Sequence, residues 1–247
     1  MISPDLPVVA IFGTNDATAD ELAAAELLGA AVHKAQAVLL TGGDLKPSRP
    51  RHVKDAAIFA ANGAASPGRP ARWIGVANKE TAAPAQWHGA DAVVLTPGWG
   101  HRRNFVEACL CDAAVAVGGA SPGTSSEALF SLYLGRPLLV VGGGGAGPRT
   151  VRQLRVLSEQ RIGHRARTSL AVDRGIAGAY AWADEVDSTL DVRALPTSAA
   201  SASDLVAEVL GSATHRAPRP EFDRLVDEAA WDSFVAMALH EAGRDAG

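Results

Sequence analysis

Short apolar segments that end in turn residues alternate with segments of helical periodicity along most of this 247-residue chain. Parallel strands that helices cover on both faces are expected to read as such continuous apolar runs. The predicted strands lie at 7–13, 37–43, 72–76, 91–96, 112–119 and 136–142. The predicted helices lie at 18–34, 46–63, 101–110, 124–134, 151–161 and 201–211. The alternation therefore predicts an α/β fold, with a doubly wound, mainly parallel sheet that has helices on both faces.

The pattern is weaker in the C-terminal third, where 168–172 and 177–183 are predicted as two further strands. Residues 212–220, rich in Pro, Arg and small side chains, predict a linker. We expect a Rossmann-like domain over residues 1–211, followed by this linker and a C-terminal helical extension over 221–247. Apolar side chains cover a wide arc of the last helix, which therefore packs on its own domain or contacts another copy. Of these two, we favour a homodimer.

The composition is that of an ordinary globular protein, with 47% hydrophobic residues and a net charge of −4. So small a charge argues against nucleic acid or an anionic membrane surface as the partner. The N-terminal segment has no basic region, and its apolar run is too short for a signal peptide or a membrane span, so we expect a cytoplasmic protein. Cys109 and Cys111 are expected to be buried thiols, and no Cys/His pair has the spacing of a metal site.

Three predicted strands end in glycine-containing turns that lead into helices, at Gly13-Thr14, Gly42-Gly43 and Gly118-Gly119. In open parallel sheets, ligands bind at the carboxyl ends of the strands, where helix N-termini present free N–H groups. None of the turns matches the dinucleotide fingerprint or the P-loop. We therefore expect a mononucleotide or a sugar phosphate as the ligand.

The segment RNFVEACLCDAAVAVGGASPGTSSEALFSLYLGRPLLVV, residues 103–141, resembles the core of the LOG (Lonely Guy) proteins. These proteins are often labelled lysine decarboxylase-like and belong to the wider LOG/DprA-type Rossmann superfamily. The family pattern is an Arg, a strand and then P-G-G-x-G-T-x-x-E, and Arg103 and Asp112 keep the family's separation. The resemblance covers about residues 7–142, and its specific part is 103–127.

The resemblance implies a phosphoribohydrolase that cleaves the N-glycosidic bond of a nucleoside 5′-monophosphate, giving the base and ribose 5-phosphate without a cofactor. Glu127 would be catalytic, because an oxocarbenium-like transition state needs a nearby carboxylate, and Arg103 would be the second catalytic residue, which assists the departing base or positions the substrate. The residues expected to bind the ligand are Gly13, Thr14, Gly42, Gly43, Asn104, Gly118, Gly119, Ser121, Gly123, Thr124 and Ser125. Nothing in the sequence suggests the PLP-bearing lysine that a decarboxylase requires.

The loop after the second strand, GGDLKPSRPRHVKDA at 42–56, departs from the family pattern. This departure favours the alternative function, a non-catalytic nucleotide or cofactor-binding protein of the same superfamily that acts as a sensor or carrier. Whether the chain is an enzyme therefore stays open at this point.

Several residues also have a purely structural interpretation. Thr124-Ser125-Ser126-Glu127 has the T-x-x-E spacing of a capping box, in which Glu127 would only cap a helix. Arg103 follows two other basic residues and is alternatively a solvated helix residue. The glycines at 142–147 are either a loop or a ligand contact, and Trp99 either stacks on a base or packs in the core.

Overall fold

The computed structural model describes residues 5–42, 52–78, 89–96, 100–118, 121–143, 148–159, 170–218 and 228–244. Within these ranges, seven strands form one parallel sheet in the order β4-β3-β2-β1-β5-β6-β9. The strands are β1 (Val8–Gly13), β2 (Val38–Gly42), β3 (Trp73–Asn78), β4 (Ala92–Thr96), β5 (Ala113–Val117), β6 (Leu138–Val141) and β9 (Val192–Arg193). β7 (Arg149–Thr150) and β8 (Thr189–Leu190) form a separate antiparallel pair. The six predicted strands of the first paragraph are β1 to β6, and the parallel doubly wound fold is confirmed.

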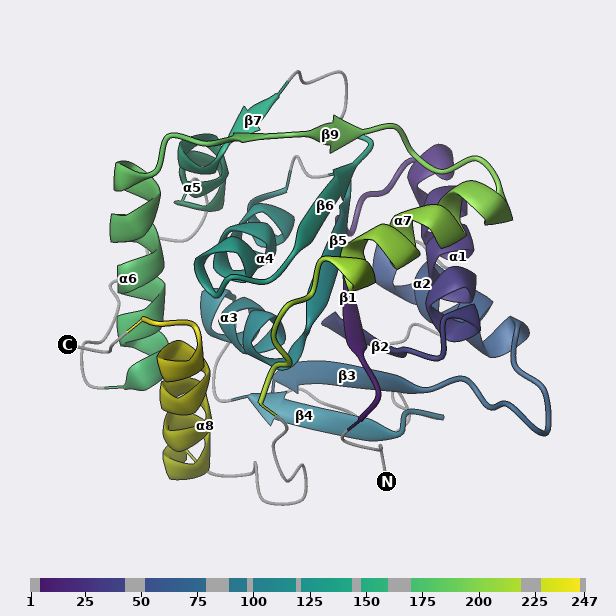
Figure 1. Cartoon of the computed structure of the whole chain (residues 1–247), viewed down its shortest axis with the longest axis horizontal. Helices are drawn as coiled ribbons and strands as arrows, with labels where there is room; N and C mark the ends of the chain where they lie inside the picture. The colour runs from purple at the N-terminus through teal and green to yellow at the C-terminus, as the bar shows by residue number, and fades with distance from the viewer. Residues whose placement is uncertain are drawn as a thin grey trace.

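Helices cover both faces of this sheet (Figure 1). One layer consists of α1 (Ala19–Lys34), α2 (Val53–Gly63) and α7 (Ala199–Gly211). The other consists of α3 (His101–Leu110), α4 (Pro122–Tyr133), α5 (Val151–Glu159), α6 (Ala171–Glu185) and α8 (Glu228–Glu241). Among the described residues, no helix has the length and apolar character that a membrane span requires.

The alternation of side chains along each strand divides the core into two. Val8, Ala10 and Phe12 of β1 point into the core beneath α3 and α4, whereas Val9 and Ile11 point into the core beneath α1 and α2. All five are buried, because successive strand residues face opposite sides and each side carries a helical layer. The central strands therefore read as unbroken apolar runs, which is the pattern from which the sheet was predicted.

The two weak strand predictions in the C-terminal third are wrong. Residues 171–172 and 177–183 lie in α6, a helix of 15 residues, while residues 168–169 lie outside the described ranges. The buried residues Val172, Ile176, Ala179 and Ala183 follow one another at spacings of three and four, which is helical periodicity. The alanine and glycine content of the segment weakens the apolar contrast, so the helical period is hard to see in the sequence.

The last helix packs on its own chain. Trp231, Val235 and Leu239 of α8 are buried in the core cluster that also contains α3, α4 and α6 residues. The indole of Trp231 donates a hydrogen bond to the carbonyl of Leu95, with an N···O distance of 3.0 Å. The apolar side chains of α8 are therefore buried within one chain, and the homodimer stays a prediction. The division into 1–211, 212–220 and 221–247 also stays a prediction.

The polypeptide before α8 is also tied to the sheet. Asp112, immediately before β5, accepts hydrogen bonds from the main-chain N–H groups of Val8 (2.7 Å) and Ala217 (2.6 Å). Asp112 therefore fixes the amino ends of two central strands and part of the predicted linker. Cys109 and Cys111 flank Leu110, the last residue of α3. Both are buried free thiols, as expected, and burial raises the pKa of both.

Candidate functional site

A cavity of about 440 Å³ opens at the carboxyl edge of the sheet beside β1, where the strand order reverses: β2 lies on one side of β1 and β5 on the other. Such a reversal in strand order is where open α/β sheets bind ligands. Four segments line the cavity: the turn after β1 and the first turns of α2, α3 and α4. The lining residues are Gly13, Thr14, Asn15, Asp16, Lys54, Gly100, Arg103, Asn104, Ser121, Pro122, Gly123, Thr124 and Glu127.

The N-terminus of α4 forms one wall. Ser121 is the N-cap: its hydroxyl accepts a hydrogen bond from Thr124 N–H at 3.2 Å, and its carbonyl accepts one from Ser125 N–H at 3.0 Å. Pro122 has no N–H to leave unpaired, and the Gly123 N–H has no acceptor within the described part of the chain. This single free amide lies at the positive end of a helix of 12 residues, a favourable position for an anion.

The capping-box interpretation of Glu127 is wrong. Helix α4 begins two residues before Thr124, with Ser121 as its cap, so Glu127 lies in the second turn and too far along to reach the cap's amide. Its side chain is instead buried at the cavity, where one carboxylate oxygen lies 3.3 Å from Lys54 Nζ. The sequence offered Thr124 as a cap, but Ser121 followed by a proline is an equally good helix start.

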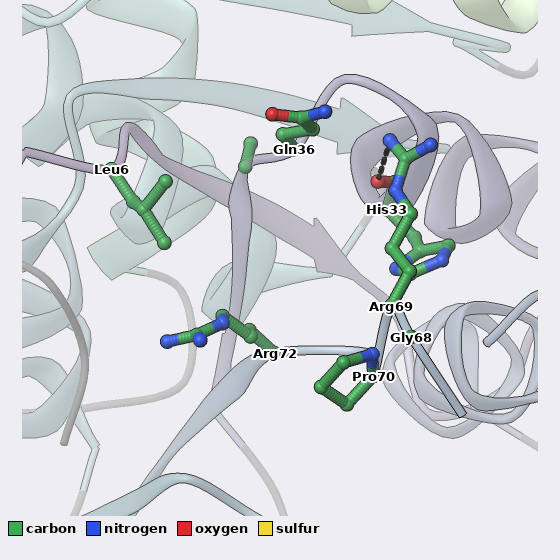
Figure 2. Close-up of a pocket in the computed structure, with 8 residues that line it drawn as sticks. Leu6, His33, Gln36, Gly68, Arg69, Pro70 and Arg72 are labelled. Carbon is green, nitrogen blue, oxygen red and sulfur yellow. Dashed lines mark hydrogen bonds between the residues drawn. The ribbon is translucent and has the colours of Figure 1, made fainter. Parts of the chain in front are cut away.

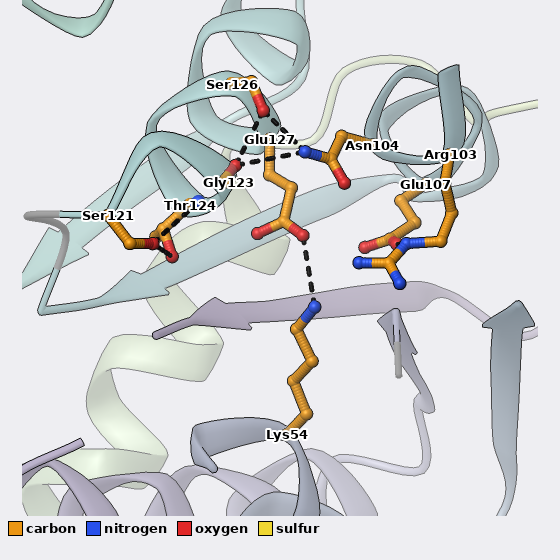
Figure 3. Close-up of polar contacts among 9 residues, drawn as sticks. All are labelled: Lys54, Arg103, Asn104, Glu107, Ser121, Gly123, Thr124, Ser126 and Glu127. Atoms are coloured by element: carbon orange, nitrogen blue, oxygen red, sulfur yellow. Dashed lines mark hydrogen bonds and ion pairs between the residues drawn. The ribbon is translucent and has the colours of Figure 1, made fainter. Parts of the chain in front are cut away.

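Asn104 joins the two helices that flank the cavity. Its amide nitrogen donates to Ser126 Oγ at 2.6 Å and to the Gly123 carbonyl at 3.3 Å, which ties α3 to the first turn of α4 (Figure 3). Its amide oxygen is buried and has no hydrogen-bond donor among the described residues. An unpaired buried acceptor beside a cavity is costly unless a ligand or water supplies a donor, which marks Asn104 as a candidate contact.

Four ionisable side chains from three helices meet at the floor of the site (Figure 3). Lys54 of α2 pairs with Glu127 of α4, and Arg103 Nε of α3 lies 3.1 Å from Glu107 Oε1 one turn further along the same helix. Arg103 and Lys54 line the cavity, whereas Glu107 is fully buried behind them. The Arg103 and Glu127 that the resemblance singled out are therefore brought to one cavity, each paired with a residue that it did not identify.

The pKa of Glu107 is raised from 4.5 to about 7. Burial is the largest cause, because it disfavours the charged form, and the neighbouring carboxyl of Glu127 is the next. The positive charges of Lys54 and Arg103 act in the opposite direction without cancelling these effects. The site therefore contains a carboxyl group that keeps its proton to a higher pH than an exposed glutamate does.

The three basic residues at the start of α3, His101, Arg102 and Arg103, have different surroundings. His101 contacts the hydroxyl of Tyr180 on α6, and Arg102 forms a bidentate pair with Asp173 at 2.9 and 2.6 Å. Arg103 alone lines the cavity. The interpretation of Arg103 as a solvated residue is therefore wrong, because its two basic neighbours anchor α6 while its own side chain turns to the site.

The remaining predicted ligand residues lie in different environments. Gly13 and Thr14 line the cavity, but Gly42 is covered by the side chain of Glu107. The amide of Gly118 is already used, since it donates to the Val141 carbonyl at 2.8 Å, and the residue adopts a φ of +74°. Ser125 is buried behind the first turn of α4 and does not line the cavity.

Some predictions cannot be placed. Gly43, Gly119, Trp99 and the glycines at 144–147 lie outside the described residues. Gly142 begins the glycine-rich segment 142–147 and lies within the described residues. It donates its N–H to the Arg193 carbonyl at 2.9 Å and does not line the cavity.

Sequence reasoning missed Lys54, Glu107 and the pair Asn15-Asp16. Lys54 lies within the 42–56 segment, which was considered only as a departure from the family pattern. Glu107 lies one helical turn after Arg103, a spacing that signals an i, i+4 ion pair. That spacing is visible in the sequence, but the burial of Glu107 against Gly42 is a tertiary feature.

A second cavity, of about 360 Å³, lies at the opposite edge of the sheet, before the starts of β1, β2 and β3 (Figure 2). Its Arg69 donates hydrogen bonds to the His33 and Lys34 carbonyls at the end of α1. Burial, with Arg69 nearby, lowers the pKa of His33, which favours a neutral imidazole. Because Arg69 is already hydrogen-bonded to the C-terminus of α1, we take the cavity at the carboxyl edge as the candidate site.

Comparison with known proteins adds a family match and several similar folds. A model described as the SLOG cluster4 family matches residues 6–168. The molybdenum cofactor carrier protein of Chlamydomonas reinhardtii is 21% identical, with 83% of this chain and 99% of that chain covered and a TM-score of 0.52. The molybdenum cofactor binding protein of Rippkaea orientalis is 20% identical, with 84% and 99% covered and a TM-score of 0.53. No curated protein sequence matches the chain. At such identities, the similar structures show the fold alone.

Proposed function

This chain belongs to the SLOG cluster4 family, and we propose that it is a non-catalytic protein that binds a phosphorylated nucleotide or cofactor in the cavity beside α4. The resemblance to the LOG proteins holds at the level of the superfamily. The observation that carries the proposal is the convergence of a free helix N-terminus, Lys54 and Arg103 on one cavity at the strand-order reversal.

The first turn of α4 is suited to a phosphate group. Gly123 has no side chain to keep an oxyanion from its N–H, and the hydroxyls of Ser121 and Thr124 lie 2.9 Å apart at the same end. The helix dipole adds a favourable interaction of about 0.3–1 kcal/mol for a negative charge at this position. Lys54 and Arg103 supply formal positive charge from the facing helices.

The remaining wall is suited to the rest of such a ligand. Asn104 offers an unpaired amide oxygen that accepts a hydrogen bond from a hydroxyl or a ring N–H. Asp16, exposed at the rim after β1, offers a carboxylate to ribose hydroxyls or to ring N–H groups. A cavity of about 440 Å³ is within the usual range for small-molecule sites, about 300–1,000 Å³.

Glu127 favours binding over hydrolysis. A carboxylate that stabilises positive charge on a ribose ring works best when it has no cation beside it, since a cation offsets its negative charge. Here Lys54 Nζ lies 3.3 Å from Glu127, and both side chains are almost completely buried. The ion pair therefore reduces the charge that Glu127 presents to a ligand.

The proposal is tested by binding and turnover measurements on one set of ligands. Nucleoside monophosphates, nucleoside diphosphates and a molybdenum cofactor preparation are added to the intact protein, and affinity is measured by calorimetry. We expect at least one ligand to bind with micromolar affinity and to remain chemically unchanged. Lys54→Met should weaken this binding at least tenfold, whereas Arg193→Met, which removes an exposed charge on β9, should leave it unchanged. If Lys54→Met binds as well as the unmodified chain, or if no ligand binds, the proposal fails.

A second candidate is the phosphoribohydrolase, because Arg103 and Glu127 line the same cavity. It predicts release of free base and ribose 5-phosphate from a nucleoside monophosphate, which chromatography detects. Glu127→Gln should then abolish turnover while keeping the ligand bound. Turnover that depends on Glu127 would replace the carrier function by the hydrolase.

A further inference from the structure

Glu107 is a buried carboxyl that no ligand in the cavity can touch directly. Its side chain is 0% exposed, and its carboxyl group lies against the main chain of Gly42 at the end of β2. In the described part of the chain, Arg103 and Glu127 stand between it and the cavity. Any influence of Glu107 on a ligand is therefore exerted through these neighbours.

Three of the four carboxyl oxygens of Glu107 and Glu127 have no hydrogen-bond donor among the described residues. Both oxygens of Glu107 and one of Glu127 are buried without a hydrogen bond from any described residue, and Arg103 Nε, although 3.1 Å from Glu107, is not aligned for one. Two ionised carboxylates side by side would also repel each other in a site of low dielectric constant. A proton on Glu107 removes the repulsion and supplies one of the missing donors.

Building on the proposed function, we infer that Glu107 carries a proton beside Glu127 and is a positioning residue through which the site takes up an oxyanion together with a proton. Among the described residues, the charged groups that act on Glu107 are Glu127 from α4, Lys54 from α2 and Arg103 from its own helix. With Glu107 neutral, these groups have a formal charge of +1, and with Glu107 ionised the charge is zero. The protonated form is therefore the one that attracts an anion.

The proton balance is explicit. When an oxyanion binds beside Lys54 and Arg103, its charge disfavours the ionised form of Glu107, and the Glu107 carboxylate forms an O–H bond with a proton from solvent. Since the pKa of Glu107 is about 7, the coupling falls in the neutral range. Below that pH the proton is already present, and above it each pH unit should weaken anion binding by up to about tenfold.

Sulfate is a suitable probe, because its charge does not change between pH 5.5 and 8.5. We expect sulfate affinity, measured by calorimetry, to be constant below pH 6.5 and to fall above pH 7. Measurements at pH 8 in two buffers of different ionisation enthalpy should show uptake of close to one proton for each sulfate bound. Glu107→Gln, which is neutral at every pH, should bind sulfate with a pH-independent affinity and without proton uptake. Glu208→Gln, an exposed control on α7, should keep the pH dependence.

The outcomes separate this inference from the proposed function. A protein that binds the nucleotide or cofactor set but shows the same sulfate dependence on pH before and after Glu107→Gln overturns this inference alone. A protein that binds neither sulfate nor any ligand of the set overturns both. Titration of the ¹³C-labelled glutamate carboxyls by NMR provides a check that needs no ligand: a midpoint for Glu107 near 4.5 contradicts the proton on Glu107, and one near 7 that Glu107→Gln removes supports it.

Discussion

The carboxyl group of Glu107 occupies the space that a side chain at Gly42 would fill. A Cβ atom at position 42 would lie 1.6 Å from Glu107 Oε1 and 2.4 Å from Oε2, so the end of β2 and the middle of α3 approach as closely as they do only because residue 42 is glycine. Gly42 was predicted from the sequence to bind the ligand. In the structure, this glycine instead makes room for the buried carboxyl behind the site.

Gly42→Ala should therefore destabilise the protein. The new methyl group displaces a buried carboxyl from the space that it occupies, and overpacking of this kind costs about 1–3 kcal/mol. Denaturant unfolding should report this loss of unfolding free energy. Gly63→Ala is the matched control: a Cβ there meets nothing within 4 Å, and the residue ends α2, so we expect a neutral or slightly stabilising effect. Equal effects of the two substitutions would contradict the close approach.

The pH dependence of stability should change when Glu107 is replaced by Gln. The folded-state pKa of Glu107 is raised from 4.5 to about 7, so the folded chain binds more protons than the unfolded chain between these values. The stabilisation from this proton is fully present below pH 4.5 and is lost as pH rises through 7. A shift of this size corresponds to about 3 kcal/mol.

The measurement is the difference in unfolding free energy between the unmodified chain and Glu107→Gln, followed from pH 4.5 to 8. This difference cancels the titration of groups that both proteins share. We expect it to decline with pH and to level off above pH 7.5. A difference that grows with pH would instead mean that Glu107 is ionised in the folded chain and that Arg103 holds it so.

The cap of α4 provides a further test of the anion site. Ser121→Ala removes the acceptor of Thr124 N–H and should cost about 1 kcal/mol of unfolding free energy. Ser198→Ala removes the equivalent cap of α7, which is outside the cavity, and should cost about the same. Sulfate bound at α4 supplies a new acceptor for Thr124 N–H. Added sulfate should therefore shrink the deficit of Ser121→Ala and leave that of Ser198→Ala unchanged, and the reverse would place the anion elsewhere.

The fold was predictable because β1 to β6 and most helices have a local sequence pattern, and these patterns repeat along the chain. The strands β1, β2 and β5 are continuous apolar runs, and the capping box of Thr18 and Glu21 marks the start of α1 in the sequence as it does in the structure. The helix α6 was missed because Ala177, Gly178 and Ala181 dilute its apolar periodicity. Its stability comes from contacts such as Arg102–Asp173, which join segments 71 residues apart.

The site was only partly predictable for a related reason. Arg103, Asn104, Gly123 and Thr124 lie in one stretch that matches a family pattern, and all four line the cavity. Lys54 comes from a helix about 50 residues earlier, and nothing in its own neighbourhood indicates that it faces Glu127. Whether Glu127 would cap α4 or face the cavity depended on where the helix begins, and the sequence offers two equally good starts three residues apart.

Two adjacent arginines with different partners allow stability and binding to be separated. Arg102 pairs with Asp173, which is almost completely buried, so Arg102→Met leaves an uncompensated carboxylate and should cost about 3 kcal/mol or more of unfolding free energy. Arg103→Met leaves Glu107, which is stable as a neutral acid, and should cost less.

Ligand affinity should follow the opposite order. Arg103 lines the cavity, so its loss should weaken binding of sulfate or a phosphorylated ligand at least tenfold, whereas folded Arg102→Met should bind normally. Calorimetry under conditions where both variants remain folded gives the comparison, and Asp173→Asn should reproduce the stability loss of Arg102→Met without affecting affinity. If Arg102→Met weakens binding as much as Arg103→Met, the first turn of α3 acts as one unit, and the positive charge of Arg103 cannot be separated from the anchoring of α6.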